Sequence, residues 1–264
     1  MTAPPRLTDH AALARNRARA TATFLHAAVA DEIEERLDTV NKTFTAPAVV
    51  TPFPTVWAGR VPGARIVGGG PVLDLAPGAH DLVIHALCLH WTDDPVGQIV
   101  QCARALRPDG LFLAAFFGGR TLAPLRAALA EAEVAVTGGL SPRVLPMVDI
   151  RDAGGLLQRA GLALPVADSL PFRVRYADSF ALMRDLRAMG EGNALAGRLR
   201  RPTRRAVLME AAARLVGEAG VEALFEVIVL TGWAPHAGQQ QPLRPGSAAM
   251  RLADALPRRG TAGD

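Results

Sequence analysis

Residues 81–119, DLVIHALCLHWTDDPVGQIVQCARALRPDGLFLAAFFGG, decide the fold. The apolar runs at 81–87 and 111–117 have the composition of buried strands. Between them, residues 95–106 carry apolar side chains at helical spacing with a proline in the first turn, and residues 107–110 are a turn signal. Strand, helix, turn and strand in this order predict a βαβ crossover, and therefore a parallel sheet with helices on its faces.

The flanking segments extend this pattern on both sides. Residues 9–40 have an apolar stripe at helical spacing and predict one long amphipathic helix. Residues 48–50 and 64–67 read as two short strands, and the prolines and glycines between them leave little room for a full helix. Downstream, we expect helices at 122–136, 152–160, 178–189 (capped by Asp178 or Ser179) and 203–219, and strands at 172–176 and 224–232.

Composition limits the class of protein. No apolar run in the 264 residues approaches the roughly 20 needed to span a bilayer, so we expect no transmembrane helix. The first residues lack the basic start and apolar stretch of a secretory signal, which predicts a cytoplasmic protein. Cys88 and Cys102 have no zinc-site spacing and are expected to be buried, inert thiols. A net charge of +4 is weak support for nucleic-acid binding, which we do not expect.

Residues 81–119 resemble the central part of Rossmann-like S-adenosylmethionine-dependent methyltransferases, where an Asp-Leu-Val strand, a Leu-His-Trp and an Arg-Pro-Gly-Gly-like turn follow one another. Three later segments, FGGRTLAPLRAAL (117–129), GGLSPRVLPMVDIRDAGGLLQRAGL (138–162) and ALMRDLRAMGEGNAL (181–195), are similar to mitochondrial complex I assembly factors of methyltransferase fold and their bacterial relatives. A more distant resemblance is to the malonyl-carrier-protein methyltransferase of biotin synthesis.

This resemblance implies an α/β fold with a doubly wound, mainly parallel sheet and an antiparallel strand near one edge. It divides the chain into a helical arm at 1–45, a methyltransferase-like domain at 46–233 and a loosely ordered tail at 234–264. A helical insertion at 178–219 is expected to cover the ligand end of the sheet together with the N-terminal helix.

The cofactor half departs from the family pattern. The first strand should lead into a glycine-rich turn, whose missing side chains let the backbone approach the cofactor. Residues 49–55, VVTPFPT, have no glycine and two prolines there, and no acid follows the strand at 64–67 to hold the ribose. We therefore expect a shortened cofactor half in which S-adenosylmethionine binding is weak or lost. The alternative is a reshaped pocket that binds the cofactor through backbone groups alone. The positions that the resemblance assigns to the cofactor are Val50, Thr51, Gly69, Gly70, Leu75, Ala86 and Leu87.

Candidate chemistry lies directly after the strand at 81–87. His90 and Trp91 follow its carboxyl end, where doubly wound folds place ligands. A histidine there either acts as a base, orients a substrate, or only packs under the cofactor loop. Asp93 and Asp94 either neutralise a basic substrate such as an arginine side chain or cap the helix that starts at Pro95. We find no catalytic triad and no metal-binding pattern.

Two classes of function follow from the resemblance. The first is an enzyme that transfers a methyl group or hydroxylates an arginine on a partner subunit. The second is a noncatalytic assembly or binding scaffold that keeps the fold without the activity. The glycine-free turn favours the second for S-adenosylmethionine chemistry. Both imply a protein partner, and the sequence does not predict an oligomeric state.

Overall fold

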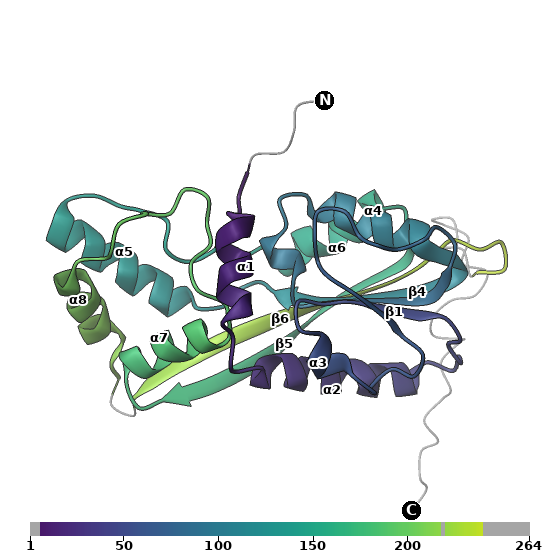
Figure 1. The fold of residues 1–264 in the computed structure, drawn as a ribbon, viewed down its shortest axis with the longest axis horizontal. Coiled ribbons are helices and arrows are strands. Elements are labelled where there is room, and N and C mark those ends of the chain that lie inside the picture. The colour runs from purple at the N-terminus through teal and green to yellow at the C-terminus, as the bar shows by residue number, and fades with distance from the viewer. Residues whose placement is uncertain (1–5, 218–219, 240–264) are drawn as a thin grey trace, which may run out of the picture.

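The computed structural model describes residues 6–217 and 220–239 and contains one six-stranded sheet in the order β2-β1-β3-β4-β6-β5 (Figure 1). Strands β2, β1, β3 and β4 are mutually parallel, and β6 runs antiparallel to both of its neighbours, β4 and β5. The predicted doubly wound sheet is confirmed, with the strands at 81–87 and 111–117 adjacent and an antiparallel strand next to one edge. The strands are β1 (Pro47–Val50), β2 (Arg65–Val67), β3 (His80–Ala86), β4 (Leu106–Phe117), β5 (Ala163–Tyr176) and β6 (Val221–Trp233).

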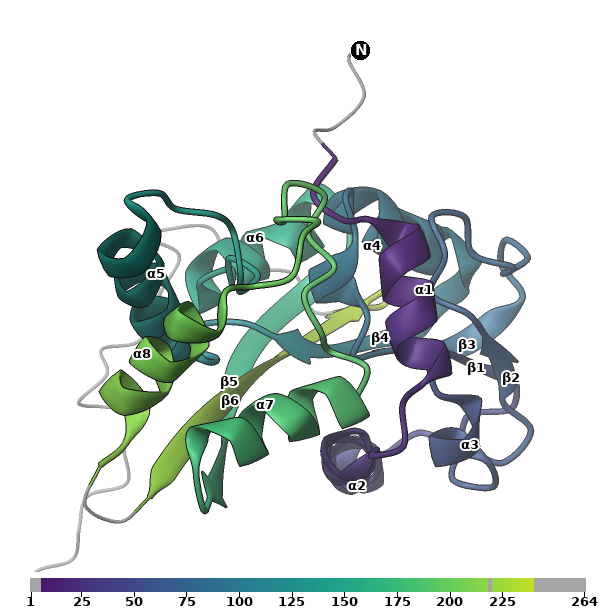
Figure 2. The ribbon, with the colours of Figure 1, turned by 60° about the vertical axis from the view of Figure 1, so that its left-hand side comes forward.

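Helices cover both faces of the sheet and bury a separate apolar core on each (Figures 1 and 2). One core joins the sheet to α2, α5, α7 and α8, and the other joins it to α4 and α6. No helix in the described residues is long and apolar enough to cross a membrane. The helices are α1 (His10–Ala18), α2 (Phe24–Thr39), α3 (Pro54–Trp57), the 3-10 turn η1 (Leu89–Trp91), α4 (Pro95–Ala105), α5 (Ala123–Thr137), α6 (Ile150–Arg159), α7 (Ser179–Ala188) and α8 (Arg205–Leu215).

Local sequence signals explain where several helices begin. The Asp94 carboxylate accepts a hydrogen bond of 2.8 Å from the Gly97 amide, and Pro95 occupies the first turn of α4. At α7, Asp178 rather than Ser179 is the cap, and its carboxylate accepts 2.7 Å from the Ala181 amide. Both helices start within a residue of the predicted position because a capping side chain and a helix-compatible backbone coincide there.

The prediction of one helix over 9–40 is wrong. The chain forms α1 and α2 with a break between them, and the break has a tertiary cause. The amides of Thr21 and Ala22 both donate to the Ala188 carbonyl at the end of α7, at 2.7 and 3.0 Å. These two donors are therefore taken out of the helical ladder by a residue more than 160 positions away.

Several other boundaries differ from the prediction. Strand β5 starts at Ala163 rather than at 172, and its prolines at 165 and 171 are tolerated because β5 is an edge strand. Residues 107–110 were predicted to be a turn that precedes the strand. They instead form an irregularity inside β4, where Asp109 has a φ of 62°. Helix α8 ends at Leu215, short of the predicted 219.

The half of the sheet formed by β1 and β2 is shortened, as predicted. The four-residue α3 is the helix between β1 and β2, and β2 forms the edge of the sheet. Residues 68–79, which join β2 to β3, contain turns and no helix. Most of the tail predicted at 234–264 lies outside the described residues. At its start, the Ala234 amide donates to the Gly110 carbonyl at 2.8 Å.

Residues 7–9, which precede α1 and which we call the strap, are bound to distant parts of the chain. The Asp93 carboxylate accepts hydrogen bonds from the amides of Leu7 and Thr8 at 2.8 and 2.9 Å. Thr8 also pairs with Leu195 in an isolated bridge, and Asp9 forms an ion pair of 2.9 Å with Arg198. As a result α1 runs beside the loop that follows α7 (Figure 2).

Candidate functional site

A hollow of about 230 Å³ lies beside η1 and the end of β4, among residues of α5, α7 and α8. We call it the apolar hollow because carbon side chains form most of its wall. Its apolar lining consists of Phe117, Leu122, Leu125, Leu129, Val144, Leu145, Met147, Met183, Leu186, Leu208 and Phe225. Its polar lining includes His90, Trp91, Arg143, Arg187, Glu191 and Asn193.

Glu191 is the buried carboxylate of this hollow, with 7% of its side chain exposed. Its Oε2 accepts 2.6 Å from the Trp91 indole N–H and lies 3.3 Å from Nε2 of His90. The Arg17 guanidinium of α1 lies 3.8 Å from Oε1. Burial by itself would raise the pKa of Glu191, but the contacts with His90, Arg17 and Trp91 outweigh it and lower this pKa to about 2. Glu191 is therefore a carboxylate at any physiological pH.

Two acceptor atoms of this group have no hydrogen-bond partner in the described residues. They are Oε1 of Glu191 and Nδ1 of His90, and both are buried. When the neutral imidazole donates its Nε2–H to Glu191, Nδ1 carries the lone pair and is an acceptor. The His90 ring packs against Phe117 with centroids 5.0 Å apart, which fixes its orientation. A ligand that donates hydrogen bonds would satisfy both atoms.

The remaining charges of the hollow are arginines in different situations. Arg143 is neutralised by Glu133, with nitrogen–oxygen distances of 2.7 and 2.8 Å. The hydrogen bonds from Arg143 lower the pKa of Glu133 to about 2. Arg187 is exposed and forms no ion pair with a described carboxylate, so it brings a free positive charge to the rim.

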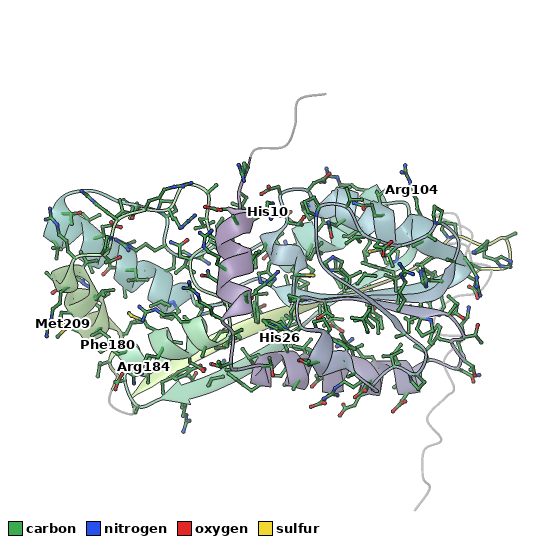
Figure 3. The ribbon with its side chains drawn as sticks, viewed as in Figure 1. His10, His26, Arg104, Phe180, Arg184 and Met209 are labelled. Atoms are coloured by element: carbon green, nitrogen blue, oxygen red, sulfur yellow. The ribbon has the colours of Figure 1, made fainter. Side chains whose placement is uncertain are left out.

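The structure brings together two of the three predicted catalytic residues. His90 and Trp91 lie in η1 and share Glu191 as their partner. Asp93 does not join them: besides the amides of the strap, it contacts Nε2 of His10 at 3.0 Å. Burial would raise the pKa of Asp93, but the hydrogen bonds from the strap and His10 lower it. Its carboxylate therefore anchors α1 (Figure 3 labels His10 there), while Asp94 caps α4.

Residue Glu191 was missed by the sequence analysis. It lies in an irregular segment after α7, and its two partners are about 100 positions earlier in the chain. The available signal was a lone acid between two glycines at 190–192, where Gly190 has a φ of 77° and follows the end of an amphipathic helix. That pattern is common in helix-ending loops, so it did not single out the residue.

The positions predicted to hold the cofactor are brought together, but at a packed end of the sheet. The side chains of Val50, Thr51, Ala86 and Leu87 are at most 2% exposed. Gly69 lies so close to Cys88 that a Cβ on it would be 2.6 Å from the sulfur. Gly70 is held through its carbonyl by the Gln98 amide, and Leu75 packs on the same core.

The turn that follows β1 contributes bulk to this packed end. Phe53 packs edge-on against His26 of α2, with ring centroids 4.5 Å apart (Figure 3 labels His26). Trp57 of α3 is 1% exposed. Asp74, the nearest carboxylate along the chain, is 85% exposed and paired with Arg65. Aromatic and aliphatic side chains therefore occupy the region that was predicted to face the cofactor.

Both cysteines are free and buried. Cys88 lies 3.6 Å from Nδ1 of His85, but burial dominates and raises the pKa of its thiol to about 12. Burial also raises the pKa of Cys102. Neither thiol is a nucleophile at neutral pH, because the thiolate is the reactive form.

Comparison with known proteins places this geometry in a family. Residues 56–114 match the model of the methyltransferase domain. The chain is 40% identical over 180 residues to the mitochondrial arginine-hydroxylase NDUFAF5 of Dictyostelium discoideum, covering 66% of this chain and 41% of the relative. It is 33% identical over 226 residues to the human protein of the same name, covering 82% of this chain and 64% of the relative.

A second group of relatives carries a different name. The malonyl-[acyl-carrier protein] O-methyltransferase of Laribacter hongkongensis is 36% identical over 177 residues, which cover 66% of this chain and 58% of the relative. The chain thus spans less than two thirds of the length of each of these three relatives. Together with the doubly wound sheet, these matches show that the chain belongs to the Rossmann-like S-adenosylmethionine-dependent methyltransferase family, in which its relatives include the NDUFAF5 arginine-hydroxylases.

Proposed function

We propose that this protein binds an arginine side chain of a partner protein in the apolar hollow, and that it does so as a scaffold without S-adenosylmethionine. The partner belongs to the assembly of respiratory complex I. The observation that carries the proposal is the buried Glu191 carboxylate, whose Oε1 has no hydrogen-bond partner in the described residues.

The shape and chemistry of the hollow suit an arginine. Its guanidinium has only hydrogen-bond donors. The unpartnered Oε1 of Glu191 is an acceptor, and the unpartnered Nδ1 of His90 is an acceptor when the ring is neutral and carries its proton on Nε2. The methylenes of the side chain would pack against the apolar lining, as with Met183 and Leu186. Bound in this way, the arginine would be oriented by Glu191 and sheltered from water by α7.

The cofactor positions support the second half of the proposal. An adenosyl group would need space beside Val50 and Ala86, and both side chains are at most 2% exposed and packed on their neighbours. Pro52 and Pro54 remove two backbone donors from the turn, and Phe53 adds bulk where the family has glycine. The residues present do not fit this cofactor, so we assign it no step.

The relatives support two parts of the proposal: that the bound side chain is an arginine, and that the partner belongs to complex I assembly. The relatives from Dictyostelium discoideum and human bear the name arginine-hydroxylase, and the resemblance that connects them to complex I assembly runs through the segments that form this hollow. The malonyl-carrier-protein methyltransferases match the chain as well, but an acidic acyl group would meet the Glu191 carboxylate as a like charge.

A pair of peptides tests the arginine site. One is a ten-residue Gly/Ser peptide with blocked ends, in which a single central arginine carries the only charge, and the other has citrulline at that position. A charge-assisted hydrogen bond contributes about 1.5 to 3 kcal/mol, so we expect the arginine peptide to bind at least about tenfold more tightly. Equal affinity for the two peptides would contradict the proposal.

Two variants place the binding in the hollow. Glu191→Gln should abolish the preference for arginine over citrulline. Met183→Trp fills the hollow without a change of charge and should weaken binding of the arginine peptide, whereas Met209→Trp makes the same change at a 50% exposed position of α8 and should not (Figure 3). A thermal melt of each variant confirms that it is folded.

Calorimetric titration with S-adenosylmethionine and S-adenosylhomocysteine tests the scaffold role. We expect no heat of binding at micromolar ligand. A dissociation constant in the low micromolar range would show that the packed end opens to admit the cofactor, and would overturn the cofactor-free scaffold role.

A further inference from the structure

Six arginines surround two further hollows near the apolar hollow. We call these six arginines the arginine surface. One hollow of about 530 Å³ lies between the strap and the loop after α7, and the other, of about 320 Å³, lies between α1 and the end of α7. The arginine surface consists of Arg6, Arg15, Arg198 and Arg200 around the first hollow and Arg19 and Arg187 around the second.

The charges of this surface are poorly balanced. Asp9 is the only carboxylate among the described residues that line the two hollows. It is paired with Arg198 and Arg200, at 2.9 and 3.7 Å, so those two guanidinium groups share one negative charge. Arg15 and Arg19 are exposed and form no ion pair with a described residue. A net positive charge is therefore concentrated here, although the whole chain carries only +4.

The two hollows lie along α1, and the second of them adjoins the proposed arginine site. Arg15 of α1 lines the first hollow, and Arg19, the C-cap residue directly after α1, lines the second. Four positions correspond to about 6 Å along a helix axis. Arg187 and Gly192 line both the second hollow and the apolar hollow. A chain that follows the exposed face of α1 therefore arrives at the rim of the apolar hollow.

We propose that the arginine surface binds an acidic segment of the partner protein, next to the residue that the apolar hollow receives. This inference rests on the proposed function for its geometry, since it places the acidic segment beside the bound arginine. Carboxylates spaced along an extended peptide would meet Arg15, Arg19 and Arg187 in turn, and guanidinium groups bind carboxylates in a bidentate manner.

The described side chains favour a protein partner over a membrane or a nucleic acid. None of the large exposed apolar residues, such as Phe24, Leu140 or Met209, lines either hollow, so no side chain is placed to insert into a bilayer. No aromatic ring lines them for stacking on bases. Concave sites whose charged lining is mainly arginine suit carboxylates on a flexible chain.

The test uses an arginine-free peptide of ten residues that alternates Glu and Gly, carries a neutral dye, and is compared with its Gln/Gly counterpart by fluorescence anisotropy. The double variant Arg15→Glu/Arg19→Glu removes the central charges of the surface. The matched control, Arg104→Glu/Arg159→Glu, makes the same change of net charge at exposed positions of α4 and α6 (Figure 3 labels Arg104).

We expect the Glu peptide to bind the unmodified protein and the control variant with similar affinity. It should bind Arg15→Glu/Arg19→Glu at least about tenfold more weakly. The Gln peptide should bind none of them, and added salt should weaken the Glu complex. Equal binding of the Glu peptide to both double variants, or of the Gln peptide to the unmodified protein, would overturn the proposal.

Two further measurements separate the alternatives. The protein should not co-sediment with vesicles of phosphatidylcholine that contain 30% phosphatidylglycerol. If it does, and if Arg15→Glu/Arg19→Glu abolishes this co-sedimentation but leaves binding of the Glu peptide unchanged, the surface binds a membrane instead. Arg15→Glu/Arg19→Glu should keep the preference of the unmodified protein for the arginine peptide over the citrulline peptide. The arginine site and the acidic-segment site can thus fail independently.

Discussion

Two regions at the carboxyl ends of neighbouring strands have opposite character. Beside β1 and β3, Val50, Ala86 and Leu87 are packed closely with aromatic and aliphatic side chains. Beside β4, a hollow of about 230 Å³ remains, with the Glu191 carboxylate at its edge. Both regions lie where doubly wound folds bind ligands. This contrast is the one expected if the protein works as the proposed scaffold, with a filled cofactor half and an open partner half.

The largest expected loss of stability comes from removing the buried carboxylate of the hollow. Glu191→Gln leaves Arg17 buried beside a neutral group, and breaking a buried ion pair costs about 3 kcal/mol or more. We expect a loss of that size in the free energy of unfolding, measured with urea. The control Glu222→Gln removes an exposed partner of Arg173 and should cost less than about 1 kcal/mol. Similar losses in both variants would mean that Glu191 is not held as described.

The second prediction compares the packing of the two regions directly. Leu87→Ala opens a cavity in the packed end and should cost about 3 kcal/mol. Leu125→Ala only enlarges a hollow that already lacks atoms on one side, so we expect a loss smaller by about 1 kcal/mol. Urea denaturation of both variants measures the difference. A Leu125→Ala variant that is destabilised as much as Leu87→Ala would show that the hollow is filled in solution.

The third prediction concerns His26 in the packed end. Both of its ring nitrogens lack a hydrogen-bond partner in the described residues, and burial lowers its pKa from 6.5 to about 4. Because the folded state disfavours the proton, this histidine contributes stability above pH 6.5 that is lost as the pH falls from 6.5 towards 4. His26→Leu should add about 1 kcal/mol at pH 7 by removing the unsatisfied groups.

Thermal melts between pH 4 and pH 7.5 measure both parts of this prediction. The melting temperature of His26→Leu should fall less steeply below pH 6.5 than that of the unmodified protein. A residual slope is expected in the variant, because burial also lowers the pKa of His85 to about 4. Identical slopes would show that His26 is hydrated and does not belong to the packed end.

The sequence predicted those parts of the fold that are locally encoded. Buried runs such as 81–87, and a proline preceded by a capping acid at 94–95, specify an element by themselves. The break between α1 and α2 was not predictable, because the Ala188 carbonyl that causes it belongs to another part of the chain. The start of β5 was missed for a related reason: prolines argue against a strand unless its position at the sheet edge is known.

The candidate site was predictable to a similar degree. His90 and Trp91 follow a recognisable strand and were identified, whereas Glu191 acquires its role only from those two partners. Asp93 was identified as a candidate site residue, but its partners are backbone amides of the strap. Side chains that interact with distant backbone leave no periodic or motif signal in the sequence.

The strap also sets an order of events during synthesis. Residues 7–9 leave the ribosome well before Asp93, Leu195 and Arg198, the residues that they contact. Contacts between such distant residues form late, because closing a long loop costs entropy before the contact repays it. Helix α1 is therefore made before its partners and is among the last elements to dock, and until it does, the indole of Trp91 and the carboxylate of Glu191 face water in the nascent protein.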